Sequence, residues 1–137
     1  MLYFSIELLL RMRVTEDERQ SLEKRALELL ALNDRATREG LLSLEDDIPT
    51  IADPFFKAAL MLVMDGYGES FLEAALTGLI FAEAPRGLQL LRMLLEAEAA
   101  VSLSLGEPSV SMMQRIGCYL GPDSLLRLAA TARGSTR

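Results

Sequence analysis

The chain has 137 residues, of which 20 are acidic and 14 basic, so its net charge at pH 7 is −6. Half of the residues are hydrophobic and a quarter are charged, which excludes wholesale disorder and is consistent with a single domain over residues 1–137. An acidic chain repels phosphate groups, so neither nucleic acids nor anionic membrane surfaces are expected partners.

Hydrophobic runs in the chain are short. The longest stretch without a charge, Ala74–Ala82, has nine residues, whereas a membrane-spanning helix needs about 20 apolar residues. The N-terminal segment MLYFSIELLLRMR lacks a basic lead and contains Glu7, which favours a packed helix over a signal peptide. We therefore expect a cytoplasmic protein without a membrane span.

The chain has few residues of the types that usually carry catalysis. The chain has no histidine, and its one cysteine, Cys118, lies among apolar residues where a buried thiol is expected. Glu96 and Glu98 are two residues apart on a predicted helix and so face different directions. The acidic run Glu45–Asp47 could hold a divalent cation loosely, but such clusters are mostly solvated. We expect no enzyme, no metal site and no cofactor.

The first predicted helix starts near Glu16, because Thr15 and Glu18 fit a capping box. Its apolar face repeats at spacings of three and four through Leu22, Ala26, Leu29, Asn33, Ala36 and Gly40, with Leu30 and Leu44 beside it. This favours one long helix that continues through the stretch ATREGLLSLE (36–45) over a stop at Asn33 or Gly40. The segment DDIPTIAD (46–53) is then expected to be a loop.

Five further helices are indicated by caps and breakers, the first of them by Asp53 as N-cap and Pro54 at the first helical position. They are Pro54–Met64, Glu69–Glu83, Gly87–Leu105, Pro108–Leu120 and Asp123–Ala132. In the first of them we expect a buried face of Phe55, Ala58, Ala59, Leu62 and Val63. The fold class is therefore all-α, a compact bundle of about six to seven helices.

The predicted helix Gly87–Leu105 is apolar on two faces. Leu88, Leu91, Leu95 and Ala99 line one face, and Leu90, Leu94, Ala97 and Val101 line the other. A helix that is apolar on two sides is usually buried in its own domain. Core packing is the favoured interpretation, and a homo-oligomer interface is the alternative.

Charge is concentrated in the first part of the chain. Residues 1–53 hold 12 acidic and 7 basic side chains, whereas residues 54–137 hold 8 and 7. A solvated helix face is the ordinary explanation for such a distribution, and a charged docking surface is the functional one.

Three segments resemble the cytoplasmic part of the MotA family of flagellar motor stator proteins. They are ALELLALNDRATREGLLSLED, DPFFKAALMLVMDGYGESFLEAAL and, less closely, SLGEPSVSMMQRIGCYLGP. The resemblance implies a cytoplasmic helical domain whose charged residues bind the rotor switch protein FliG or another motor component. It makes Arg35, Thr37, Arg38, Glu39, Glu45 and Asp46 the candidate protein-binding residues.

The resemblance has two departures from the family pattern. Thr37 stands in place of the first arginine of the family's arginine pair, whereas Arg38 and Glu45 match the second arginine and the glutamate. The family's membrane helices have no counterpart here, so proton conduction is not implied. We therefore expect a soluble MotA-like protein that modulates motility. A helical scaffold or adaptor outside motility is the alternative, and self-association is compatible with either.

Overall fold

The computed structural model describes residues 11–135, and the regular structure in this range is entirely helical. Its elements are α2 (Glu16–Ser21), α3 (Glu23–Glu39), the 3₁₀ helix η1 (Leu41–Thr50), α4 (Pro54–Met64), α5 (Glu69–Glu83), α6 (Gly87–Leu105), α7 (Ser109–Gly117), the 3₁₀ helix η2 (Cys118–Leu120) and α8 (Pro122–Ser135). The predicted all-α bundle of six to seven helices is confirmed. The helix expected in the N-terminal segment lies largely in residues 1–10, outside the described range.

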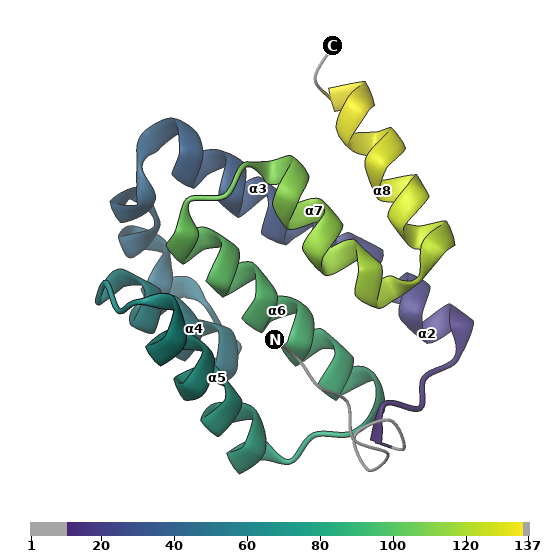
Figure 1. Cartoon of the computed structure of the whole chain (residues 1–137), viewed down its shortest axis with the longest axis horizontal. Coiled ribbons are helices and arrows are strands. Elements are labelled where there is room, and N and C mark those ends of the chain that lie inside the picture. The colour runs from purple at the N-terminus through teal and green to yellow at the C-terminus, as the bar shows by residue number, and fades with distance from the viewer. Residues whose placement is uncertain (1–10, 136–137) are drawn as a thin grey trace.

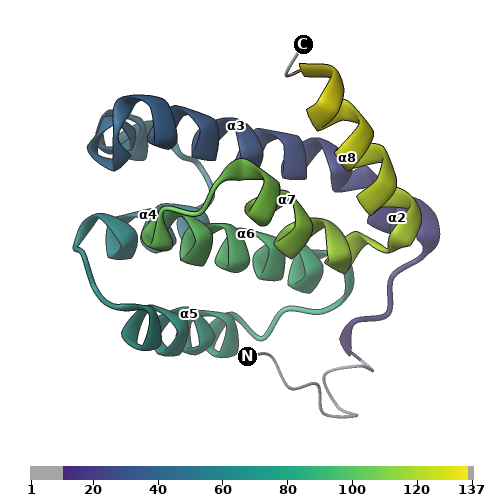
Figure 2. The same cartoon turned by 45° about the horizontal axis from the view of Figure 1, so that its top comes forward.

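Helix α6 lies at the centre of the bundle and contacts α3, α4, α5 and α7 (Figures 1 and 2). Residues of both predicted apolar faces are buried, among them Leu91, Leu95 and Ala99 on one and Leu90, Leu94 and Val101 on the other. The favoured interpretation of this helix as core is thereby confirmed. Among the helices of residues 11–135, none combines the length and apolar character that crossing a bilayer requires.

The predicted helix caps form as expected. Thr15 and Glu18 make the reciprocal hydrogen bonds of a capping box at the start of α2. The Asp53 carboxylate accepts the backbone N–H of Phe55 at 3.2 Å and so caps α4. These contacts satisfy backbone donors that a helix start leaves without partners.

The predicted long first helix is wrong in two places. Leu22 leaves the helical ladder with ψ near zero (φ −87°, ψ −2°), which separates α2 from α3. Gly40 then ends α3 with φ +91° and ψ 151°, and η1 begins at the next residue and runs to Thr50. The segment expected as a loop from residue 46 is therefore mostly 3₁₀ helix. The apolar repeat did not reveal the break, because a 3₁₀ helix also has a spacing of three and still buries Leu44.

Gly40→Ala is expected to lower the free energy of unfolding by about 1–3 kcal/mol, because positive φ with extended ψ is almost restricted to glycine. An added Cβ would meet no atom within 4 Å, so the cost is backbone strain alone. Gly78→Ala is the matched control. An added Cβ there also meets no atom, but Gly78 lies inside α5, where alanine is expected to raise the free energy of unfolding by as much as about 1 kcal/mol. Urea denaturation measures both, and equal signs would contradict the prediction.

The predicted burial of Cys118 is wrong, because its side chain is exposed. The buried face of this region runs through Met112, Met113, Ile116 and Leu120. Cys118 lies between the last two of these at a helical position on the opposite side. Apolar neighbours in the sequence were therefore a poor guide to its surroundings.

The buried face of α4 is wider than predicted. Phe55, Ala59 and Val63 are buried as expected, but Ala58 and Leu62 are only partly buried. Phe56 and Leu60 are buried as well, because α4 packs against η1 and α5 in addition to α6. The burial of Phe56 brings it beside the cleft described below.

Candidate functional site

The six candidate protein-binding residues lie in the last turns of α3 and in the first part and middle of η1. Figure 1 shows the end of α3 at one corner of the molecule. We call this set the charged edge; it consists of Arg35, Thr37, Arg38, Glu39, Glu45 and Asp46. All of them are exposed except Arg35, which is half-buried. The turn at Gly40 brings the two parts of the set to the same corner.

Arg35 holds this corner together. Its Nη2 atom forms an ion pair with the Asp47 carboxylate and donates to the carbonyl oxygen of Ser43 at 3.4 Å. Its Nε atom lies 3.8 Å from the Glu39 carboxylate. Because its guanidinium joins α3 to η1, Arg35 has a structural contact in addition to its predicted binding role.

The remaining residues of the charged edge are less constrained. Thr37 donates its hydroxyl to the carbonyl of Asn33 at 2.9 Å, and the Nε atom of Arg38 donates to the carbonyl of Asp34 at 3.4 Å. Within residues 11–135, the carboxylates of Glu45 and Asp46 form no hydrogen bond or ion pair. The charged groups of Arg38, Glu45 and Asp46 therefore face solvent, and their role in binding stays a prediction.

The acidic run Glu45–Asp47 is also the segment that could hold a divalent cation loosely. Across the part of the chain that the structure describes, no group of three His, Cys, Asp or Glu side chains is arranged to hold a metal ion. The third member of the run, Asp47, is engaged by Arg35.

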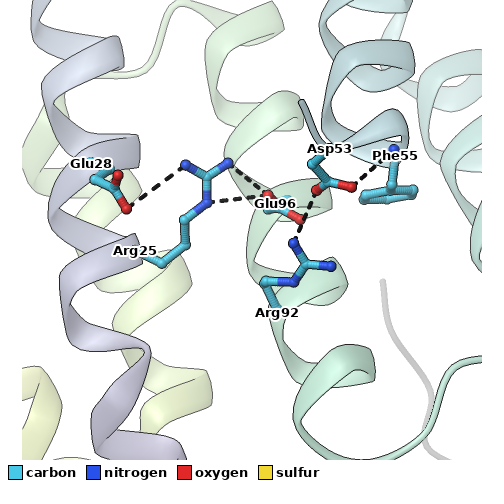
Figure 3. Close-up of polar contacts among 6 residues, drawn as sticks. All are labelled: Arg25, Glu28, Asp53, Phe55, Arg92 and Glu96. Carbon is cyan, nitrogen blue, oxygen red and sulfur yellow. Dashed lines mark hydrogen bonds and ion pairs between the residues drawn. The ribbon is translucent and has the colours of Figure 1, made fainter. Parts of the chain in front are cut away.

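A second group of charges lines a cleft of about 410 Å³ between α3, α6 and the connection from η1 to α4. Arg25 of α3 donates from Nη2 and Nε to the same oxygen of Glu96, Oε2, at 2.6 and 3.1 Å (Figure 3). The Arg25 guanidinium also lies over the Phe56 ring, 4.7 Å from its centroid. Glu96 has no exposed side-chain surface, whereas Arg25 is 23% exposed.

The carboxyl group of Glu96 has a strongly altered proton affinity. Burial raises its pKa from 4.5 to about 7, although the hydrogen bond and the charge of Arg25 act in the opposite direction. The nearby Asp53 carboxylate raises the pKa further. Glu96 is therefore poised to gain or lose a proton near neutral pH.

Asp53 links this cleft to the start of α4. Besides capping α4, its carboxylate accepts from Nη1 of Arg92 at 3.2 Å (Figure 3). Arg92 lies one helical turn before Glu96 on α6. Each arginine therefore binds one carboxylate: Arg25 binds Glu96 of α6, and Arg92 binds Asp53, the N-cap of α4.

This second group was not predicted from the sequence. From the sequence, Glu96 is only one of two carboxylates that face different directions, and Asp53 is only a helix cap. One local signal was present, since Met93, Ala99 and Ala100 surround Glu96 on the same side of the helix and are buried. The partner Arg25 lies 71 residues away, so no local pattern could identify it.

Comparison with known proteins finds two partial similarities. A segment of 38 residues is 53% identical to Motility protein A of Borreliella burgdorferi, which covers 28% of this chain and 15% of that protein. A segment of 57 residues is 39% identical to the uncharacterized protein YtxD of Bacillus subtilis, which covers 42% of this chain and 21% of that protein. No family model matches the chain, and no solved structure matches it.

These similarities agree in part with the resemblance to stator proteins. The chain is an all-α bundle, part of which is similar to a motility protein. The matched segments span about a fifth or less of the length of either relative. The activities and partners of a whole motility protein therefore come to this chain only as proposals.

Proposed function

We propose that this protein is a non-enzymatic, motility-associated protein that binds the rotor switch protein FliG, or another component of the flagellar motor, through the charged edge. In this role it modulates rotation. The observation that carries the proposal is the solvent-facing set of Arg38, Glu45 and Asp46 on a corner braced by the ion pair between Arg35 and Asp47. The partial similarity to Motility protein A supports a role in motility.

The physics of exposed charges suits a reversible contact. A single exposed ion pair contributes about 0–1 kcal/mol, so one pair does not hold a complex. Several complementary charges can speed the encounter and set the orientation of two proteins, and salt screens them. A partner that engages and releases repeatedly needs such a surface.

Glu45→Lys is expected to weaken binding of purified FliG by at least about threefold at low salt, because it replaces an attraction by a repulsion. The measurement is a titration at low and high ionic strength, with weaker binding and a smaller effect of the variant expected at high salt. Glu83→Lys makes the same charge change at an exposed position of α5 and is the matched control. Absence of binding at low salt, or equal effects of the two variants, would contradict the proposed contact.

The alternative is a helical scaffold or adaptor outside motility. One observation favours it: α5 buries only Leu72 and Leu76 fully and leaves Phe71 52% and Phe81 84% exposed. Exposed aromatic side chains are common in protein interfaces. If FliG does not bind and sedimentation shows a larger species as concentration rises, this alternative is favoured, and the apolar surface of α5 becomes the first place to look for the contact.

A further inference from the structure

One oxygen atom in the cleft lacks a hydrogen-bond donor. Arg25 donates twice to Oε2 of Glu96, and Oε1 of the same carboxyl group is buried without a partner in the described part of the chain. A buried polar atom without a partner is rare and costs free energy. The atom is closed off from solvent, so water or a ligand does not reach it as the cleft stands.

The group beside this oxygen is another acceptor. The Asp53 carboxylate lies next to Glu96 in Figure 3, and its charge raises the pKa of Glu96. Two ionised carboxylates have no hydrogen to share and repel each other. A proton on Glu96 removes both difficulties, because it turns the unpartnered oxygen into a donor toward Asp53.

We propose that Glu96 and Asp53 share one proton and form a proton-binding site that couples the middle of α6 to the start of α4. In the protonated state Glu96 accepts from Arg25 and donates to Asp53, so both of its oxygens are satisfied. Asp53 in turn keeps its contacts with Arg92 and with the backbone N–H of Phe55.

The surrounding charges are consistent with a single shared proton. From α3, Arg25 faces Glu96, and it is also 4.0 Å from the exposed Glu28. From α6 itself, Arg92 faces Asp53 and balances its charge.

One further charged residue that lines the cleft, and one charged cluster on the far side of α6, are already paired. Asp47 of η1 also lines the cleft but is engaged by Arg35. On the opposite side of α6, Arg115 of α7 binds Glu98 and Glu107. Within the described residues, Oε1 of Glu96 is therefore the one oxygen of the carboxyl pair without a donor, and a proton would supply it.

Loss of the proton places two carboxylates side by side at the junction of η1 and α4. The connection that follows η1, which includes Ile51 and Ala52, lines the same cleft. We therefore expect this connection to be held less tightly once Glu96 is ionised. Any effect of this proton on binding at the charged edge rests on the proposed function, whereas the existence of the proton-binding site does not.

The test is a carboxyl carbon-13 NMR titration of the full chain, compared with Glu96→Gln and Asp53→Asn. In the native chain one glutamate is expected to titrate near neutral pH, and this signal is absent in Glu96→Gln. Asp53→Asn keeps a good N-cap residue but removes the neighbouring charge. In Asp53→Asn, the midpoint of the Glu96 titration is expected to fall by about one pH unit, a tenfold change in proton affinity.

A second readout follows the connection between η1 and α4. At pH 8, amides of residues 47–56 are expected to exchange several-fold faster in the native chain than in Glu96→Gln, whose neutral amide imitates the protonated acid. At pH 5 the two proteins should exchange equally. Comparison at the same pH removes the intrinsic pH dependence of exchange.

Glu98→Gln is the matched control, because it neutralises a half-buried glutamate on the other side of α6 and should leave the neutral titration in place. The proposal is overturned if every glutamate titrates in the ordinary acidic range, or if Asp53→Asn leaves the midpoint unchanged. Should Glu96→Gln fail to fold, the Asp53→Asn titration still decides. None of these measurements needs a partner protein, so they can fail independently of the proposed function.

Discussion

Replacing Leu95 with alanine is expected to lower the free energy of unfolding by about 3–5 kcal/mol. Leu95 has no exposed surface and lies on α6, the helix that the other large helices surround. The substitution costs the transfer free energy of the lost isopropyl group and leaves a cavity that four packed helices cannot close. The loss is measured by urea denaturation, with the slope of the transition used to verify that both proteins unfold in one step.

The control for this prediction is Leu126→Ala. This substitution removes the same atoms on α8, but Leu126 is 68% exposed. The free energy of unfolding is therefore expected to change by no more than about 0.5 kcal/mol. A loss below about 1 kcal/mol at Leu95, or losses of similar size at the two positions, would show that α6 is not the centre of the core.

Replacing Arg25 with methionine is expected to lower the free energy of unfolding by about 2 kcal/mol at pH 8, because it leaves the buried Glu96 carboxylate without its counter-charge. Methionine retains an apolar stem beside Phe56, so most of the packing is kept. At pH 5 the expected cost is only about 1 kcal/mol, since Glu96 is then protonated in both proteins and only a hydrogen bond and a cation–π contact are lost. Urea denaturation at the two pH values measures the difference.

The sign of this pH effect follows from the raised pKa of Glu96. A carboxyl whose pKa rises from 4.5 to about 7 on folding binds more protons in the native state than in the unfolded state between these values. The native chain therefore loses stability as pH rises through this window, by up to about 1.4 kcal/mol per pH unit. Arg25 lowers the pKa of Glu96, so without it the loss continues to higher pH and the cost of the substitution grows.

A double-mutant cycle isolates the interaction. In a Glu96→Gln background, Arg25→Met is expected to have a smaller cost that does not depend on pH, because no carboxylate remains to be left alone. A cost that is independent of pH in the native background would contradict the assigned ion pair.

The charged edge could be predicted from the sequence only in part. Its exposure could be anticipated, because the polar side of an amphipathic helix faces solvent. The ion pair between Arg35 and Asp47 could not, since these two residues meet only through the turn at Gly40, whereas Arg35 and Glu39 are neighbours one turn apart on α3. Charge reversal at Glu45 therefore tests the docking proposal more cleanly than a substitution at Arg35, which would also disturb the corner.

Sequence by itself determined the fold class, the positions of most helices and the burial of α6. The physical reason is that these features depend on groups within about four residues of one another. Thr15 and Asp53 cap the turns that follow them, and apolar residues repeat along one face. The same local reasoning failed at Gly40, where a 3₁₀ helix continues the apolar spacing of the α-helix before it.

Only the tertiary structure decided how charges far apart in the chain are combined. Arg25 and Glu96 are 71 residues apart, and Asp53 and Arg92 are 39 residues apart. Whether Glu96 is solvated or buried depends on the packing of α3 and α4 against α6, and that packing sets its proton affinity. A side chain's charge is read from the sequence, but its dielectric surroundings and its partner exist only in the folded chain.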